Sequence, residues 1–392
     1  MASRHEPPDE EAARTDRRIV AYGVGLILLV GALVLLPNLV PASTHEVVSD
    51  LVHARIVSVD KGQNGAQPTA AVVVLDGAQA GTHLTADLQG PSSQLQLPDY
   101  RPGDEVLVSI DQHPGSPTTY TVIDRWRLPL LGVLAGAFVV AAAAIAGWRG
   151  LRAVVSLVLT LGFTVRLLIP LLLLGWSPVP LAVAFGIAVT SLSFLLTQGA
   201  SRTTASAIVG TSAGLLVSGA LAAAVTAAAR FTAAQGSDQV VTLGQLVGNR
   251  IDLSGLLLAA VIFGGLGVLN DVAMSQAATV EELAALDPGL RARDLFGRAM
   301  NVGVAHLAAT INTLVFAYLG TALPLLVILA LQVGSFGDAI NQEVIAVEVV
   351  RTLVGSLGIL AAVPLTTAVA AAWQGRTAGA RPRALAATGQ GG

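Results

Sequence analysis

The residues of this sequence whose types and spacing could support chemistry are polar or ionisable side chains set within long apolar stretches. An ionisable group at the depth of a membrane costs about 2.5–3.5 kcal/mol on insertion scales, so each such residue needs an explanation. A carboxylate at that depth can carry an ion, and a histidine can exchange a proton near pH 7. The candidate polar intramembrane site comprises Arg166, Asn270, Asp271, Ser275, His306, Thr310, Asn312, Glu343, Glu348 and Arg351.

The first cluster follows a glycine-rich stretch, Gly264-Gly-Leu-Gly267, which lets another helix approach closely because only backbone lines that face. Asp271 and Ser275 lie four residues apart and therefore share one face of a helix, and Asn270 and Gln276 add carbonyl and amide groups nearby. Two interpretations remain open. Asp271 is either a functional carboxylate inside the membrane or the cytoplasmic end of a span, where headgroups and water surround it.

A second cluster lies on the next predicted span. His306, Thr310 and Thr313 follow one helical stripe, and Asn312 lies to one side of it. A lone histidine in a membrane can serve as a hydrogen-bonding group between helices. As the only histidine of the predicted helical part, His306 is also the natural candidate for a proton switch near pH 7.

A third cluster, Glu343, Glu348 and Arg351, lies between the last two predicted spans and at the start of the last one. It is either an amphipathic interfacial helix with a Glu348–Arg351 pair or a group of carboxylates at the outer mouth of a pathway. Arg166 stands apart, four residues before Pro170. It either reaches the membrane surface or caps carbonyls that the proline leaves free, or it is the counter-ion of a carboxylate on another helix.

Several kinds of chemistry are excluded by what the sequence lacks. It has no cysteine, which rules out disulfides, thiol catalysis and cysteine-ligated metals. It has no phosphate-binding loop and no His-Glu-x-x-His motif. Gly210-Thr-Ser-Ala-Gly214 matches a nucleophile elbow as a string, but it lies in an apolar span, where small residues serve helix packing. We therefore expect no cofactor and no metal, and the net charge of −3 excludes a globally basic nucleic-acid binder.

The composition indicates which elements position these residues. Hydrophobic residues make up 53% of the chain and charged residues only 12%. A soluble protein could not bury so much apolar side chain, so the composition predicts an α-helical polytopic membrane protein. The stretch 303–332 is either one kinked helix or a span with a re-entrant piece, because Gly320 and Pro324 could break it. About eight transmembrane helices are expected, at 19–40, 128–148, 151–174, 179–197, 204–229, 253–273, 303–332 and 350–373.

Residues 41–127 differ in character and predict a small all-β module between the first two spans. Turn signals rich in Gly, Pro, Asp and Asn separate its β-branched runs. These runs lie at 53–59, 70–75, 105–110 and 118–123. About five strands in such a length suit an OB-like or similar barrel.

Arginines near the predicted span ends indicate the topology, because cytoplasmic loops collect positive charge. Most of them fall on one side of the membrane if there are eight spans. We therefore expect both termini in the cytoplasm, as the disordered tails 1–18 and 375–392, and the β module outside the cell membrane. The helical bundle would occupy 128–374.

Three motifs carry a further signal. They are Asp271-Val-Ala-Met-Ser275, Thr-Ile-Asn-Thr-Leu at 310–314 with Ala-Tyr-Leu-Gly and Leu-Pro-Leu within 317–325, and Glu343, Glu348 and Arg351 before Val-Gly-Ser-Leu-Gly at 354–358. With these motifs, the order of features over residues 45–374 resembles the YibE/F-like family of multi-pass bacterial membrane proteins. One motif departs from the family pattern: members often carry Gly-Arg-Asp before the position of His306, and here the residues are Gly303-Val-Ala305. The resemblance implies an architecture and a bacterial cytoplasmic membrane, and it transfers no catalytic residue.

Two functions of different classes remain open, and an enzyme is a third. An ion-coupled transporter or permease would use Asp271, Glu343 or Glu348 as ion-carrying carboxylates and His306 as a proton relay. A membrane-anchored scaffold or sensor would instead bind an envelope component or a partner protein through the β module. An intramembrane enzyme would need two carboxylates as acid and base, and the sequence gives no pair a distance. Besides the lipid bilayer, that envelope component or protein is the expected partner, while substrate and oligomeric state stay open.

Overall fold

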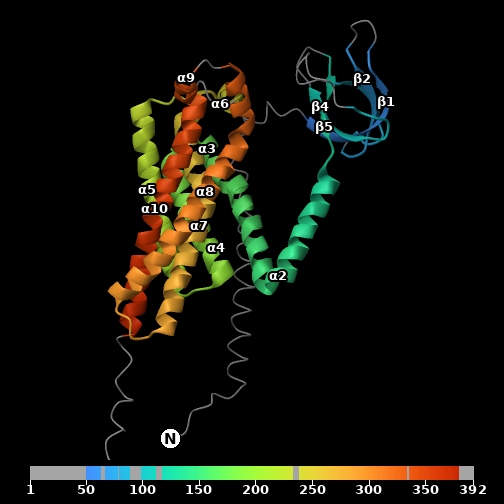
Figure 1. Cartoon of the computed structure of the whole chain (residues 1–392). Helices are drawn as coiled ribbons and strands as arrows, with labels where there is room; N and C mark the ends of the chain where they lie inside the picture. The colour runs from blue at the N-terminus through green and yellow to red at the C-terminus, as the bar shows by residue number, and fades with distance from the viewer. Residues whose placement is uncertain are drawn as a thin grey trace, which may run out of the picture. The chain divides into compact units, whose positions relative to one another are not determined.

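The computed structural model describes residues 50–62, 67–77, 79–88, 99–111, 117–232, 238–332 and 335–378 (Figure 1). The predicted tail 1–18, the predicted span 19–40 and most of the predicted tail 375–392 lie outside the described residues. The chain divides into two compact units. One comprises Ala42–Ile145, and the other comprises Ala146–Gly392 together with Met1–Pro41.

The first unit contains a closed barrel in the order β1-β2-β3-β5-β4. Its strands are β1 (Asp50–Asp60), β2 (Thr69–Val74), β3 (His83–Leu88), β4 (Glu105–Asp111) and β5 (Thr119–Arg125). β3 and β5 pair in parallel, and the other neighbouring strands pair antiparallel. Alternate residues face the core, as Ala70, Val72 and Val74 of β2 show. The small all-β module is confirmed, and its five-stranded barrel is of the size that an OB-fold has.

The four predicted strands correspond to β1, β2, β4 and β5, whereas β3 is not among them. Its sequence, His-Leu-Thr-Ala-Asp-Leu, contains only one β-branched residue, so its local preference for a strand is weak. Pairing with neighbouring strands therefore stabilises β3 where its own strand propensity is weak. β3 pairs with β2 on one side and β5 on the other, and Ala86 and Leu88 are buried in the barrel core.

The helical stretch after the barrel is interrupted once. α2 (Leu128–Phe163) contains Gly147 at φ 56 and ψ −135, a conformation that residues with a Cβ rarely adopt, so two helical pieces meet there. The boundary between the two units falls beside this glycine. The π-helical turn η2 (Thr164–Leu168) and the short helix α3 (Ile169–Leu173) continue the stretch. The predicted spans 128–148 and 151–174 are therefore one helical stretch with a break at Gly147.

The second unit is a bundle of long helices. Its further elements are α4 (Pro178–Gln198), α5 (Arg202–Ala229), α6 (Asp238–Val247), the 3-10 turn η3 (Gly248–Arg250), α7 (Leu253–Leu286), α8 (Ala292–Gln332), α9 (Phe336–Asn341) and α10 (Glu343–Ala378). Among the described residues, six helical stretches are long and apolar enough to cross a membrane, namely Leu128–Leu173, α4, α5, α7, α8 and α10. The described part of the chain is therefore mostly helical, as the composition predicts.

Three helices differ from the predicted spans in their length. α8 is one helix that starts at Ala292 and contains Pro324, so the stretch 303–332 includes no separate re-entrant piece. α7 continues to Leu286 instead of ending at 273, because the residues after its polar cluster are mostly good helix formers, Val280-Glu-Glu-Leu-Ala-Ala-Leu286. α10 starts at Glu343 rather than at 350.

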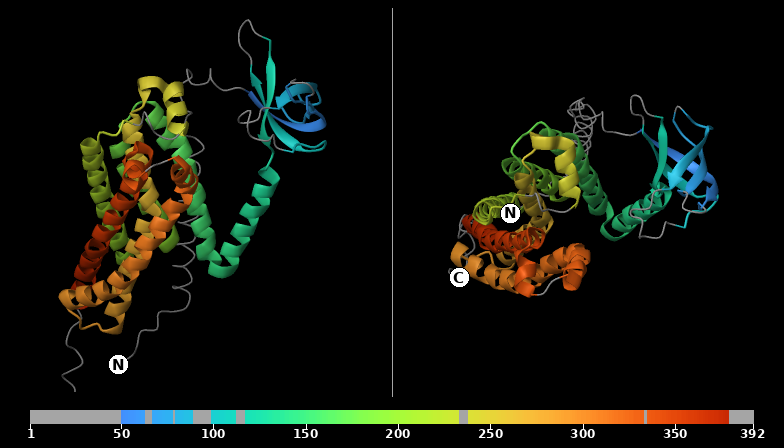
Figure 2. Two further views of the ribbon diagram at one scale, coloured as in Figure 1. Left: turned by 45° about the horizontal axis from the view of Figure 1, so that its top comes forward. Right: turned by 90° about the horizontal axis from the view of Figure 1, so that it is seen from above.

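The centre of the bundle lies where α5, α7 and α10 contact one another most extensively (Figure 2). Small residues allow this approach. A Cβ added at Gly210 of α5 would collide with Thr366 of α10, and one at Gly214 would lie 3.1 Å from the carbonyl oxygen of Gly358. The predicted packing role of Gly210-Thr-Ser-Ala-Gly214 is confirmed. α8, by contrast, buries a narrow stripe against α7 and α10, formed by Gly303, Leu307, Thr310, Leu314 and Tyr318.

Candidate functional site

Asp271 lies in the middle of α7, since the helix continues for about four turns beyond it. A cavity of about 620 Å³ lies between the second piece of α2, α4 and α7, and Asp271 lines it. Gly267, which also lines this space, helps to keep it open, because nothing lies within 4 Å of where its Cβ would be. We call this space the Asp271 cavity. Its polar lining consists of Arg149, Ser193, Thr197, Gln198, Asn270 and Asp271.

His306 of α8 lies close enough to Asp271 of α7 for their charges to interact. Both side chains are exposed. The structure therefore brings together the first two clusters of the sequence, which come from different helices.

The other polar residues of these clusters are held by local bonds. Asn270 accepts a hydrogen bond from the buried hydroxyl of Thr190 on α4 (3.1 Å), which ties α4 to α7 at the cavity. Ser275 donates to the carbonyl oxygen of Asp271 (2.7 Å), and Thr310 donates to that of His306 (3.0 Å). These two hydroxyls are thus satisfied within their own helices. Asn312 lies on the exposed side of α8.

Gln276 is a central contact that the candidate residues do not include. Its side-chain amide donates to the carbonyl oxygen of Ala299 on α8 (2.9 Å) and to the hydroxyl of Thr367 on α10 (2.8 Å). Gly303 packs directly against it, and a Cβ there would lie 2.7 Å from Gln276 Oε1. Helical geometry could have indicated that Gln276 faces a neighbouring helix, because a residue next to Ser275 points about 100° away from it.

The two positions at which the resemblance leads us to expect Arg-Asp fall outside this contact. Gly303 keeps the glycine where Gln276 leaves no room for a side chain. Val304 and Ala305, which stand at the other two positions, lie on the exposed side of α8. Neither position therefore belongs to the buried stripe of α8.

A second polar group joins α8 and α10. The predicted Glu348–Arg351 pair is present, with Arg351 Nη1 2.9 Å and 3.0 Å from the two carboxylate oxygens. The guanidinium lies 6.0 Å from the centre of the Tyr318 ring, within range of a cation–π contact. Tyr318 is buried against Gly264 of α7, and its hydroxyl has no hydrogen-bond partner among the described residues.

Glu343 and Arg166 lie apart from both groups. Glu343, the first residue of α10, accepts hydrogen bonds from the backbone N–H (3.0 Å) and the hydroxyl (3.2 Å) of Thr232. The predicted interfacial helix is divided, since α9 ends before Gln342 and α10 starts after it. Arg166 lies in η2, a widened turn before Pro170, and is not among the residues that line the Asp271 cavity.

The barrel has a polar cluster of its own around Glu105 of β4. Arg55 Nη2 and His53 Nε2 contact its two carboxylate oxygens at 2.8 Å and 3.1 Å. The hydrogen bond from Arg55, ahead of the one with His53, lowers the pKa of Glu105 below its ordinary value. The His53 ring also stacks on Trp126, with ring centroids 4.1 Å apart. No group of three or more possible metal ligands occurs among the residues that the structure describes.

Comparison with known proteins assigns the helical part. The family model described as YibE/F-like protein matches residues 134–376. No curated protein and no solved structure matches the chain. The matched range includes the Asp271 cavity and the contacts of Gln276 and Arg351, but it excludes the barrel, so it is narrower than the predicted resemblance over 45–374. Since the match covers more than half of its length, this chain belongs to the YibE/F-like family.

Proposed function

We propose that this chain is an ion-coupled membrane transporter in which Asp271 carries a coupling proton and His306 relays it. The observation that carries the proposal is the Asp271 cavity. A carboxylate in the middle of a candidate membrane-spanning helix opens onto about 620 Å³ of space, instead of lying in an ion pair with an arginine. Placing an ionisable group inside a membrane costs free energy, and groups found there typically bind and release ions.

Helix geometry supports a deep position for this carboxylate. The hydroxyl of Thr203, near the start of α5, donates to Glu281 of α7 at 2.6 Å, so Glu281 lies level with the start of α5. Asp271 precedes Glu281 by ten residues, about 15 Å along the helix. With the start of α5 at the membrane surface, Asp271 would lie near the middle of a hydrocarbon core roughly 30 Å thick.

The polar group around Arg351 supports a pathway with two ends. Gly264, which contacts Tyr318, lies seven residues before Asp271, about 10 Å further along α7. Glu348 and Arg351 are therefore candidates for the outer mouth, on the opposite side of Asp271 from the start of α5.

The same proposal includes the topology. The bundle lies in a bacterial cytoplasmic membrane, with eight spans when 19–40 is included and the two pieces of α2 are counted separately. Both termini would be cytoplasmic and the barrel extracytoplasmic. The arginines after the predicted spans, among them Arg149, Arg202 and Arg291, support this orientation.

The test uses the absence of cysteine from the chain. Val268 lines the cavity, so Val268→Cys reports its access to water. The full chain in sealed vesicles is labelled from each side with a membrane-impermeant thiol reagent under proton gradients of either direction. We expect the accessible side to change with the gradient, and Asp271→Asn to abolish this change.

Glu282→Gln is the matched control, because Glu282 is an exposed carboxylate of the same helix outside the cavity lining. It should leave the response of Val268→Cys to the gradient intact. Labelling from one side under every gradient would contradict the transporter. So would a gradient response that survives Asp271→Asn.

The barrel favours a second candidate function, a membrane-anchored scaffold or sensor. A closed barrel with an ordered polar cluster at Glu105 is a folded surface that a carrier does not need. It would bind an envelope component or a partner protein. Deletion of 45–124 would then be the severe lesion in complementation of a strain that lacks the gene, and Asp271→Asn would be mild. The transporter predicts the opposite order.

A further inference from the structure

We propose that a groove on the surface of α5, near the start of this helix, is a binding site for an anionic phospholipid, with the lipid phosphate at Arg202. The groove has a volume of about 780 Å³ and shares no lining residue with the Asp271 cavity. It does not depend on the proposed transport. Its lining includes Leu195 of α4, Ser201, Arg202, Ala205 and Ile208 at the start of α5, and Trp373 of α10.

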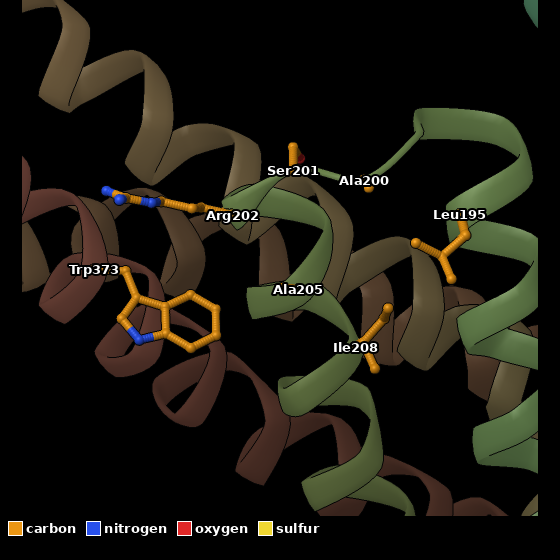
Figure 3. Close-up of a pocket in the computed structure, with 7 residues that line it drawn as sticks. All are labelled: Leu195, Ala200, Ser201, Arg202, Ala205, Ile208 and Trp373. Atoms are coloured by element: carbon orange, nitrogen blue, oxygen red, sulfur yellow. The ribbon is translucent and has the colours of Figure 1, made fainter. Parts of the chain in front are cut away.

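The groove has one charged end and an apolar remainder, as a phospholipid has. Figure 3 shows the Arg202 side chain extending from the start of α5 toward the side on which Trp373 lies. Leu195 and Ile208 lie on the other side of the same space. Leu195 is 42% exposed, so part of this apolar lining is open to the surroundings. A phosphate at Arg202 would leave the acyl chains to cover the apolar residues.

The groove also lies at the level where a headgroup belongs. α4 ends at Gln198, α5 begins at Arg202, and the candidate span of α10 ends at Gly375. Tryptophan is enriched at this level of membrane proteins, because its ring is apolar while its N–H is polar. Trp373 lies two residues before the end of its candidate span. Arg202 and Trp373 therefore flank the groove at a membrane surface.

The charge of Arg202 is available to a ligand. Its side chain is exposed, and none of the ion pairs in the described part of the chain includes it. Glu281, a carboxylate at this level, accepts a hydrogen bond from the buried Thr203 at 2.6 Å instead of pairing with Arg202. A guanidinium offers a planar set of donors that suits a phosphate. Charge complementarity and the apolar lining together favour a lipid over a free anion, which would use only one end of the groove.

The experiment reads lipid occupancy at Trp373. Trp126, Trp148 and Trp176 are the other three of the chain's 4 tryptophans, and their replacement by Phe leaves Trp373 as the only indole of the full chain. The protein is placed in vesicles that contain brominated phosphatidylglycerol or brominated phosphatidylcholine at the same mole fraction. We expect the anionic lipid to bind at Trp373 about fivefold more tightly, as for one arginine near an anionic surface.

Arg202→Gln should make the quenching by the two lipids equal. Arg293→Gln, at an exposed arginine on the first turn of α8, is the matched control and should keep the preference. Equal quenching in the parent chain would overturn the proposal, as would a preference that survives Arg202→Gln. Millimolar inorganic phosphate should leave the preference unchanged, and its loss there would identify a phosphate site instead of a lipid site.

A second reporter covers the case in which the three Phe substitutions prevent folding. Ile208→Cys in the otherwise unaltered chain provides one attachment point for a fluorescent label, because the chain has no other cysteine. The same brominated lipids should quench this label with the same preference. The absence of a preference at this position would also overturn the proposal.

Discussion

The two sides of α7 both contain glycine, but one side packs against another helix and the other side lines a cavity. On one side, Gly265 lies against Gly355 of α10, with its Cβ position 3.5 Å from the Gly355 Cα atom, and Leu269 and Val272 are buried beside it. On the other side, Gly267 has nothing within 4 Å of its Cβ position and lines the Asp271 cavity. Glycine thus closes a contact on one side and leaves a space on the other. Composition alone does not distinguish a packed face from an open one.

The largest difference in stability is expected when a side chain is added at a tightly packed glycine and at a glycine that lines open space. In Gly210→Val, the new Cβ would collide with Thr366 of α10, whose Cα atom lies 3.1 Å away. We expect a loss of about 3 kcal/mol in the free energy of unfolding, or no folded protein, since overpacking forces the backbone to move. Gly267→Val should have little effect. Thermal unfolding of the full chain in detergent measures both, and equal losses would refute the comparison.

A second pair of substitutions compares adjacent residues on the two sides. Gln276→Met removes two buried hydrogen bonds, to Ala299 and Thr367, and should cost about 2 kcal/mol. Ser275→Ala removes a hydroxyl that bonds only to carbonyl oxygens of its own helix and should change stability by less than about 0.5 kcal/mol. Chemical denaturation of the full chain in mixed micelles gives both values. A larger loss for Ser275→Ala would reverse our assignment of the faces.

The edge of the Asp271 cavity should give an intermediate effect. Thr190→Val keeps the side-chain shape but removes the hydrogen bond to Asn270 across α4 and α7, at a cost of about 1 kcal/mol. Thr197→Val is its control, because Thr197 lines the same cavity but bonds only to the carbonyl oxygen of Ser193 within α4. Hydrogen exchange of α4 peptides should increase for Thr190→Val alone. An increase of the same size in both variants would show that the interhelical bond has no special role.

The smallest effect is expected in the barrel, which serves as a reference for both sides of α7. The pKa of Glu105 is lowered chiefly by Arg55, so the carboxylate stabilises the folded barrel above the ordinary pKa of a glutamate. This contribution is lost as the pH falls through the lowered pKa. Exchange of β1 and β4 amides in the full chain, corrected for the intrinsic pH dependence, should rise in this acid range. Glu105→Gln should flatten the rise, and an unchanged profile would contradict the assignment.

Much of the fold could be predicted because its signals are local. Alternation along β2 and the β-branched runs of β1, β4 and β5 indicate strands, and long apolar stretches indicate the helices. The ends of the helices were harder to predict from the sequence. Val280–Leu286 is more polar than the rest of α7, but its residues favour a helix, so hydropathy ends the span while the backbone continues. The break at Gly147 lies close to the predicted boundary between the spans 128–148 and 151–174, although hydropathy does not encode the φ angle that forms it.

The candidate site was predictable where one helix holds both partners. Glu348 and Arg351 pair because three residues of helix bring them together. The approach of Asp271 and His306 required the register of two helices. A signal for it exists, since the two residues stand at nearly equal distances from the short loop that joins α7 to α8. Helical geometry turns Gln276 about 100° away from Ser275, but its partners on α8 and α10 follow only from packing.

The order of the strands limits when the barrel can form during synthesis. β1 is made first, yet one of its two neighbours is β4, with Asp50 opposite Ile110. β3 in turn waits for β5, the last strand of the barrel, to supply its parallel partner. The ring of hydrogen bonds therefore cannot close until the ribosome has delivered the chain as far as Arg125. Until then β1 to β4 form at most an open sheet with unpaired edges at β3 and β4, a nascent state that is prone to aggregation and that a chaperone could bind.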